Sequence, residues 1–210
     1  YDPRIGHAYL HPGIGFGGSC LPKDTKALVF LAHQLNMDTS FFEAPLNTNE
    51  KIHQKFLNYI ITYYQNDLNN KKLVVWGVAF KSGTDDTRDS PIVKVIKSIL
   101  KYNPIIYVYD PHALHNFARE MKEHLNSIIP CNNLYDGLKD ADGLIIGTEW
   151  AEFRNPDLSH LKKLMKIKVI FDAKNLYEPL KMLKNGFDYI SISYPPVFGF
   201  NPEKEKIFSN

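Results

Sequence analysis

The residue of this sequence that is best suited to nucleophilic chemistry is Cys20. It lies just ahead of a predicted helix that begins near residues 22–24, and Lys23 follows three residues later. The start of a helix and a nearby cation both stabilise a thiolate, which is the form of cysteine that attacks carbon. Asp24, four residues after Cys20, could face the same pocket and act on water or on a proton. Two simpler interpretations stay open, a small buried thiol in a tight turn and a carboxylate that stabilises the helix start.

The segment before Cys20 is too rich in glycine and proline to form a regular element. Gly13, Gly15 and Gly18 match the spacing G-x-G-x-x-G of dinucleotide-binding loops. That fingerprint requires a preceding strand, whereas here a helix is expected to end near Leu10, and Pro12 would disrupt a strand. We therefore reject the dinucleotide interpretation and expect the glycines to let the backbone approach a ligand closely.

A second candidate site lies within residues 77–91, where a predicted strand leads to a helix that begins at Ser90 and Pro91. In doubly wound folds this edge of the sheet holds nucleotides. Lys81 and Arg88 supply cations there that could hold phosphate. The alternative is a solvated turn whose Asp and Ser residues cap the helix.

Two further groups carry weaker signals. His112 and His115 form an H-x-x-H pair, but no matching Cys or carboxylate set accompanies them, so we predict no metal site. Asp110 ends a predicted strand, where an acid can hold a ribose but is also ordinary in turns.

The elements that would position these residues fall into two units, residues 1–70 and 71–210. In the first unit, apolar residues recur at helical spacing in two stripes, Ala27, Leu28, Leu31 and Leu35, and Ile52, Phe56, Tyr59, Ile60 and Tyr63. In the second, short apolar runs alternate with helical patterns, which indicates a parallel sheet covered on both faces. The expected fold is α/β, a helical segment followed by a doubly wound, Rossmann-like domain.

The second unit is expected to contain five strands and four helices. The predicted strands are residues 73–78, 105–109, 143–146, 168–171 and 189–192, and the predicted helices are residues 91–101, 113–125, 158–165 and 179–185. Residues 66–72 predict a linker, and residues 194–210 predict a loosely packed tail.

Composition excludes several classes of function. The 210 residues carry 25 Lys and Arg against 23 Asp and Glu, and a net charge of +2 gives no reason to expect nucleic acid or a membrane as partner. The longest apolar run, residues 73–80, is far shorter than the ~20 residues that cross a bilayer. The two cysteines suit a reducing compartment, so we expect a cytoplasmic protein. Because the first residue is Tyr1 and no secretory signal is visible, we expect a piece of a longer protein.

Taken together, these segments resemble the nucleotide-sugar 6-dehydrogenase family over nearly the whole chain. The motifs that carry the likeness are Arg4-Ile5-Gly6, Gly13-x-Gly15-Phe16-Gly17-Gly18-Ser19-Cys20-Leu21-Pro22-Lys23-Asp24, Phe80-Lys81-x-x-Thr84-Asp85-Asp86-x-Arg88-x-Ser90-Pro91, Thr148-Glu149-Trp150-x-x-Phe153 and Asp172-x-x-Asn175. The resemblance implies a central dimerisation segment in residues 1–70 and a UDP-sugar-binding domain in residues 71–210. The family's amino-terminal NAD-binding domain is missing, so we expect the chain alone to be inactive.

The resemblance also implies an NAD-dependent oxidation of the sugar C6 alcohol to a carboxylate, with Cys20 forming first a thiohemiacetal and then a thioester. Asp24 would help to activate water, Cys20 and Lys23 would lie against the nicotinamide, and Arg88 would reach NAD from the second domain. Arg4 would enter the neighbouring subunit's site, so at least a homodimer is implied. The remaining substrate-binding residues implied are His11, Pro12, Gly13, Ile14, Gly15, Phe16, Gly17, Phe80, Lys81 and Lys174.

The expected substrate is UDP-glucose, which the motifs of residues 148–153 and 172–175 favour. GDP-mannose is the main alternative, because Leu21 and residues 81–86 also resemble GDP-mannose 6-dehydrogenases, and oxidation of another UDP-sugar is a further alternative. One position departs from the family, since Lys174 stands where Arg is usual and lacks the planar fork of a guanidinium. Two other classes stay open: a non-catalytic nucleotide-sugar binding and dimerisation module, and a thiol hydrolase that pairs Cys20 with a distant His.

Overall fold

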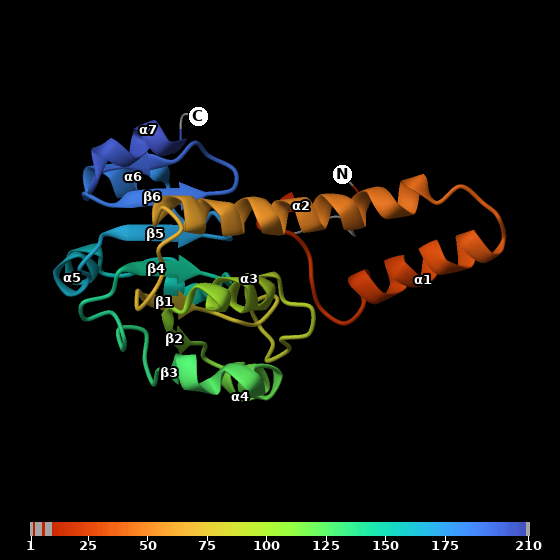
Figure 1. Ribbon diagram of the computed structural model, residues 1–210, viewed down its shortest axis with the longest axis horizontal. Helices are drawn as coiled ribbons and strands as arrows, with labels where there is room; N and C mark the ends of the chain where they lie inside the picture. Colours follow the sequence, from red (N-terminus) through yellow and green to blue (C-terminus); the bar gives the residue numbers. More distant parts are fainter. Residues whose placement is uncertain (1, 3–5, 7–9, 209–210) are drawn as a thin grey trace.

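A single seven-stranded sheet forms the centre of the protein, as the computed structural model shows for the residues it describes, 2, 6 and 10–208 (Figure 1). The strand order is β3-β2-β1-β4-β5-β6-β7, and every neighbouring pair is parallel except β6 with β7. The strands are β1 (Lys72–Trp76), β2 (Ile105–Tyr109), β3 (Ile128–Pro130), β4 (Gly143–Ile146), β5 (Val169–Asp172), β6 (Asp188–Ser191) and β7 (Val197–Phe198). The predicted doubly wound α/β fold is confirmed.

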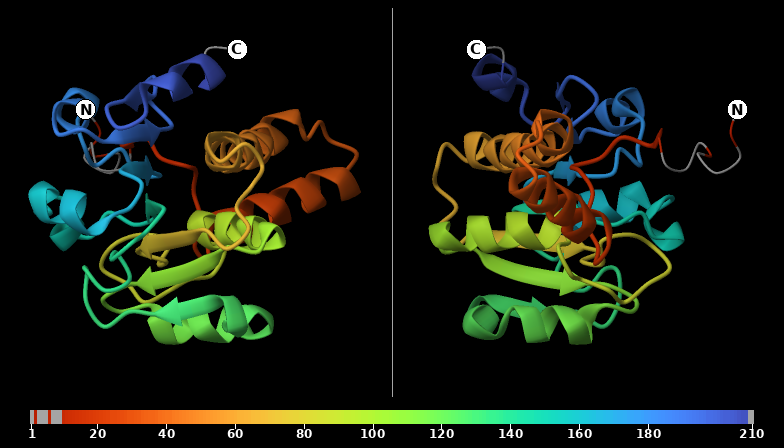
Figure 2. Two further views of the ribbon diagram at one scale, coloured as in Figure 1. Left: turned by 60° about the vertical axis from the view of Figure 1, so that its left-hand side comes forward. Right: turned by 90° about the vertical axis from the view of Figure 1, so that its right-hand side faces the viewer.

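The sheet separates two apolar cores because successive side chains of a strand point to opposite faces. Leu73 and Val75 of β1 belong to one core, and Val74 and Trp76 belong to the other. Helices cover both faces, with α2 and α3 on one side and α5 on the other (Figure 2). The helices of this domain are α3 (Pro91–Ile99), α4 (Leu114–Glu120), α5 (Leu158–Leu164) and α6 (Pro179–Lys184). Helix α3 begins directly after Ser90, as its proline predicts.

Two helices, α1 (Leu21–Gln34) and α2 (Ser40–Tyr63), form a hairpin that extends away from the sheet (Figure 1). The predicted α2 stripe is largely buried at its carboxyl end, where Phe56 and Ile60 join the core beside α3. The predicted α1 stripe remains open, since Leu31 and Leu35 are 52% and 60% exposed. An open apolar stripe is compatible with the expected dimer, which stays a prediction.

The predicted loose tail is wrong, because residues 194–208 are packed against the domain. Strand β7 pairs with β6, and helix α7 (Glu205–Phe208) sets the Phe208 ring 5.8 Å from the Tyr59 ring and 5.4 Å from the Phe198 ring. Sequence reasoning missed β3 and β7 because runs of three and two residues, one with a proline, are too short to show a period.

Several element boundaries also differ from the predictions, most of them by one or two residues. Residue Lys72, expected in a linker, is the first residue of β1. Helix α4 ends at Glu120 instead of residue 125, and a 3-10 helix over Lys122–Ser127 follows. No helix in the described part of the chain is both long enough and apolar enough to cross a membrane.

Candidate functional site

The glycine-rich loop, residues 11–20, lies across the carboxyl ends of the parallel strands. The backbone N–H of Ile14 donates to the Ala173 carbonyl after β5 at 3.0 Å, and that of Gly18 donates to the Arg88 carbonyl in the loop after β1 at 3.0 Å. The Asn175 amide donates to the Pro12 carbonyl at 2.7 Å. The structure thereby brings together segments that are more than 60 residues apart in the sequence. The remaining implied site residue, Arg4, and the helix expected to end near Leu10 lie outside the described residues, apart from a 3-10 assignment at Leu10 itself.

Asn49 of α2 clamps the middle of this loop. Its Oδ1 accepts from the Phe16 N–H at 2.8 Å, and its Nδ2 donates to the Phe16 carbonyl at 3.0 Å. The amide thus satisfies both backbone groups of one residue, as a neighbouring strand would. Sequence reasoning missed Asn49, because a lone polar residue in a helix looks like part of a solvated face.

We expect Gly15→Ala to destabilise the protein by at least about 3 kcal/mol, against about 1 kcal/mol for Gly83→Ala. Both glycines have left-handed backbone, with φ of +111° and +76°, so both substitutions carry the same kind of strain. A Cβ at Gly15 would also lie 2.1 Å from Asn49 Oδ1, whereas nothing lies within 4 Å of one at Gly83. Asn49 could move only by giving up its hydrogen bonds to Phe16. Urea unfolding of both variants measures the difference, and equal losses would contradict the clamp.

Cys20 is exposed and occupies the residue just before α1. Its Sγ lies 3.7 Å from Ser19 Oγ, and its side chain makes no capping hydrogen bond. The alternative interpretation of Cys20 as a buried apolar side chain is therefore wrong. Cys20 thus stands at the N-terminus of a helix of 14 residues, a position where the backbone dipole favours negative charge.

Two cations lie within electrostatic range of Cys20, but each has a carboxylate partner. Lys23 Nζ lies 2.9 Å from Asp24 Oδ1, and Arg88 donates to Asp86 Oδ2 at 2.8 Å. These carboxylates raise the pKa of both cations, through hydrogen bonds first and charge second, and Cys20 adds a smaller contribution in the same direction. Lys23 was expected to stabilise a Cys20 thiolate, but its nearest charged partner is Asp24.

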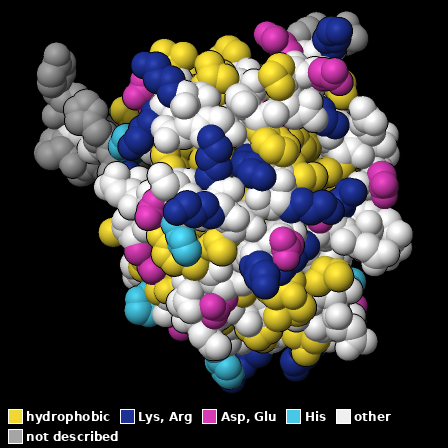
Figure 3. All heavy atoms as spheres, turned by 90° about the vertical axis from the view of Figure 1, so that its left-hand side faces the viewer, with side chains coloured by type: hydrophobic (Ala, Val, Ile, Leu, Met, Phe, Trp, Pro, Cys, Tyr) yellow, Lys and Arg dark blue, Asp and Glu magenta, His cyan; other side chains and the backbone are white. Residues whose placement is uncertain are grey.

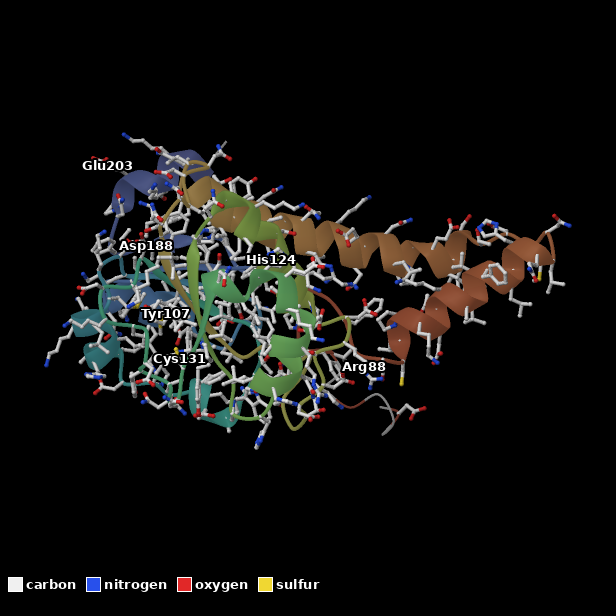
Figure 4. The ribbon with its side chains drawn as sticks, turned by 60° about the horizontal axis from the view of Figure 1, so that its bottom comes forward. Arg88, Tyr107, His124, Cys131, Asp188 and Glu203 are labelled. Atoms are coloured by element: carbon white, nitrogen blue, oxygen red, sulfur yellow. The ribbon has the colours of Figure 1, made fainter. Side chains whose placement is uncertain are left out.

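A groove of about 900 Å³ opens beside Ser19 and the start of α1. Its charged lining mixes both signs, with Lys23, Arg88, Arg119, Asp85, Asp86, Asp89 and Glu120. Figure 4 shows Arg88 on the side of the domain that faces α1.

A second, more enclosed pocket of about 450 Å³ lies where the glycine-rich loop meets the ends of β4 and β5; we call it the loop pocket. Its lining residues are His11, Pro12, Gly13, Gly15, Ser82, Glu149, Arg154, Lys174, Asn175 and Leu176. Lys174 Nζ lies 2.9 Å from Glu149 Oε2, and Glu149 Oε1 accepts from the Ser82 N–H at 3.1 Å. Three strand ends are therefore tied together at this pocket.

The loop pocket contains some of the predicted residues and omits others. Phe80 packs beneath the glycine-rich loop, since a Cβ at Gly18 would lie 2.8 Å from its ring. Lys81 is exposed, 5.5 Å from the Phe80 ring, and lines neither pocket. Arg154 and Asn175 line it although sequence reasoning gave them no binding role. Asn175 belongs to the motif of residues 172–175 just after a predicted strand, whereas Arg154 follows the motif of residues 148–153 and carries no signal of its own.

Asp110 is used by the backbone. Its carboxylate accepts from the N–H groups of Val78, Ala79, His112 and Ala113 at 2.8–3.2 Å and from the Trp150 indole at 3.3 Å. Of its two interpretations, turn chemistry is the one that the contacts support. No group of three or more His, Cys, Asp or Glu suited to a metal occurs among the described residues.

We expect iodoacetamide at pH 8 to label Cys20 and to leave Cys131 unmodified in the native protein. Burial raises the pKa of the Cys131 thiol to about 11, which leaves about 0.1% of it as thiolate at that pH. Cys131 is 4% exposed, whereas Cys20 is exposed. Mass spectrometry of tryptic peptides reads both sites, and a final step in urea shows that Cys131 is present and reactive once unfolded. Equal labelling of the two thiols in the native protein would contradict this assignment.

A largely parallel sheet covered on both faces, with polar groups gathered beyond the carboxyl ends of its strands, defines a doubly wound α/β protein whose ligands bind at that edge. Residues 74–179 match the UDP-binding domain, and residues 1–51 the central domain, of the UDP-glucose/GDP-mannose dehydrogenase family. The chain belongs to this family.

Known relatives are similar over most of this chain. It is 37% identical over 194 residues to UDP-glucose 6-dehydrogenase of Rhizobium meliloti, covering 92% of the chain and 44% of that protein. It is 33% identical to UDP-glucose 6-dehydrogenase TuaD of Bacillus subtilis, covering 96% of this chain and 43% of that protein. The chain spans less than half the length of these relatives.

Solved structures share the fold. A UDP-glucose dehydrogenase from Pyrobaculum islandicum aligns with a TM-score of 0.74 and 28% identity, over 92% of this chain and 41% of that one. A GDP-mannose dehydrogenase from Pseudomonas aeruginosa aligns with a TM-score of 0.63 and 26% identity, over 81% of this chain and 39% of that one.

Proposed function

We propose that this chain carries the reactive thiol and the nucleotide-sugar pocket of an NAD-dependent UDP-glucose 6-dehydrogenase. The observation that carries the proposal is the exposed Cys20 at the start of α1, on the same loop that crosses the nucleotide-binding edge of the sheet. A reactive carbon held by the loop would thus lie near a sulfur. Residues 1–70 would mediate dimerisation and residues 71–210 would bind the UDP-sugar, in the cytoplasm.

The chemistry assigned to this chain centres on the Cys20 sulfur. A first oxidation turns the C6 alcohol into an aldehyde. The Cys20 thiolate then adds to the aldehyde carbon, and the carbonyl oxygen takes up a proton to give a thiohemiacetal. Oxidation of that adduct leaves a thioester, and attack by water releases the carboxylate and returns the thiol. Asp24, exposed next to Lys23, would accept a proton from that water.

The cations of the groove beside Cys20 fit part of a dinucleotide. Lys23 and Arg88 would hold NAD there, because both present exposed donors near the thiol and Arg88 can grip phosphate with two parallel bonds. When bound, NAD would supply the acceptor for the hydride that leaves the sugar carbon in each of the two oxidations, so that one turnover uses two NAD. The carboxylates that share the groove pair with these cations, so binding of an anion would require them to exchange partners.

The nucleotide is the point on which two functions differ. The match to a GDP-mannose dehydrogenase structure keeps GDP-mannose as the second candidate, while the UDP-glucose 6-dehydrogenases among the relatives favour UDP-glucose. Thermal unfolding of the chain with UDP, UDP-glucose, GDP and GDP-mannose separates them. A ligand that binds only the folded state at 100 times its Kd adds about 2.7 kcal/mol, or about 5–10 °C in Tm. We expect this shift with UDP and UDP-glucose alone.

A shift with GDP compounds alone would transfer the proposal to the second substrate. If none of the four ligands shifts the Tm, the proposal that this chain holds a nucleotide-sugar pocket is wrong. A shift with UDP compounds combined with full turnover after loss of the thiol would favour the non-catalytic binding module.

A further inference from the structure

The charged side chains that line the loop pocket include one more cation than anion. Three charged side chains line it, Glu149, Lys174 and Arg154. A diphosphate carries two or more negative charges, so a pocket that binds it needs a net positive potential where the phosphates lie. Which of the two cations supplies that potential depends on what each already contacts.

Lys174 is already neutralised by Glu149. Its ammonium lies 2.9 Å from Glu149 Oε2 and 3.4 Å from the Phe80 carbonyl, and the side chains of the pair are only 16% and 26% exposed. Burial alone would raise the pKa of Glu149, but the charge and hydrogen bond of Lys174, with help from the Ser82 N–H, outweigh burial and lower it. Glu149 is therefore ionised at neutral pH, and the pair adds almost no net charge to the pocket.

Arg154 differs from Lys174 because no carboxylate among the described residues offsets its positive charge. It is exposed, and it forms no ion pair with any residue that the structure describes. A guanidinium presents a planar fork of donors that matches two phosphate oxygens at once. Lysine cannot provide that geometry, even where its charge is free.

The backbone that carries Arg154 is held by buried contacts of the preceding residue. The preceding residue, Phe153, ends the 3-10 helix Ala151–Phe153, is fully buried, and stacks on Trp76 with ring centroids 5.5 Å apart. Its carbonyl accepts a hydrogen bond from the Tyr177 hydroxyl, which comes from the loop after β5. An arginine on a fixed backbone loses less freedom when it binds than one on a mobile loop.

We propose that Arg154 holds the diphosphate of the nucleotide sugar in the loop pocket, while Lys174 and Glu149 brace the strand ends that shape it. The assignment rests on the proposed function, because it takes a nucleoside diphosphate as the ligand. It gives the anion-binding role to a residue outside the motifs that predicted the site.

Calorimetric titration of the chain with UDP and with uridine tests the assignment, because the two ligands differ only in the diphosphate. We expect Arg154→Gln to raise the Kd for UDP about 10- to 30-fold and to change that for uridine less than about twofold. The Kd of Arg154→Lys for UDP should lie between that of the unaltered chain and that of Arg154→Gln. The control is Lys163→Gln, which removes an exposed cation of α5 that does not line the pocket and should change neither Kd.

Other results overturn the assignment in different ways. If the unaltered chain binds UDP and Arg154→Gln binds it equally well, Arg154 has no such role and the proposed function stands. If Arg154→Gln weakens UDP and uridine by the same factor, the residue shapes the nucleoside site instead. If the unaltered chain binds no UDP at all, the pocket of the proposed function fails and the assignment fails with it.

Discussion

Replacing Cys20 by serine lowers NADH production from UDP-glucose by at least about 10³-fold in the complete protein, if the sulfur is the nucleophile. The physical reason is that a serine hydroxyl is a much poorer nucleophile toward an aldehyde carbon than a cysteine sulfur. Serine also cannot form the thioester that water must cleave. The effect should appear in turnover, while binding of UDP stays within about twofold because Cys20 does not line the loop pocket.

The chain offers a matched control in its second thiol. Cys131 is 4% exposed, with its Sγ 3.4 Å from the Asp136 carbonyl, and lies inside the domain away from α1 (Figure 4). Cys131→Ser should keep turnover within about twofold and cost about 1 kcal/mol of stability. If Cys20→Ser keeps its turnover, the covalent step is wrong. That result would favour the non-catalytic nucleotide-sugar binding module over the dehydrogenase role of this chain.

Replacing Asp188 by alanine lowers the free energy of unfolding by about 3–5 kcal/mol, the largest loss of stability that we expect from one substitution. The Asp188 carboxyl is fully buried at the start of β6 and accepts three hydrogen bonds. The donors are the Tyr63 hydroxyl at 2.7 Å and the N–H groups of Phe200 and Asn201 at 2.8 and 2.9 Å. One side chain thus joins the end of α2, the sheet and the carboxyl-terminal segment.

Tyr63→Phe is the graded control, because it removes one of those three hydrogen bonds and keeps the packing of the ring. It should cost about 1 kcal/mol, since the Asp188 carboxyl then keeps two donors. Urea unfolding measures both variants. A loss below about 1 kcal/mol for Asp188→Ala would show that residues 194–208 are held by other contacts.

The described face opposite the site is a mixed surface of charged and apolar side chains. On the face that Figure 3 shows, Lys and Arg side chains are spread among apolar ones, and Asp and Glu lie between them. Scattered charges of both signs are typical of a solvated protein surface.

Sequence alone predicted the parallel sheet because its strands are buried on both faces and read as continuous apolar runs. Strands β2 and β4 match their predicted ranges, and β5 and β6 are shifted by one residue. These signals are local, since each strand carries its own pattern. The C-terminal segment could not be predicted in the same way, because its order depends on Asp188 and on contacts with α2.

The sequence by itself determined that a thiol would stand at the start of a helix after a glycine-rich loop, because helix starts and glycines act over a few residues. Only the tertiary structure decided what that loop would contact. Asn49 reaches Phe16 across 33 residues, and Asn175 reaches Pro12 across 163. Only the fold, likewise, paired Lys174 with Glu149 and left Arg154 free of an ion pair with any described residue. Such pairings depend on which strand ends meet at one edge of the sheet, and no local pattern contains that information.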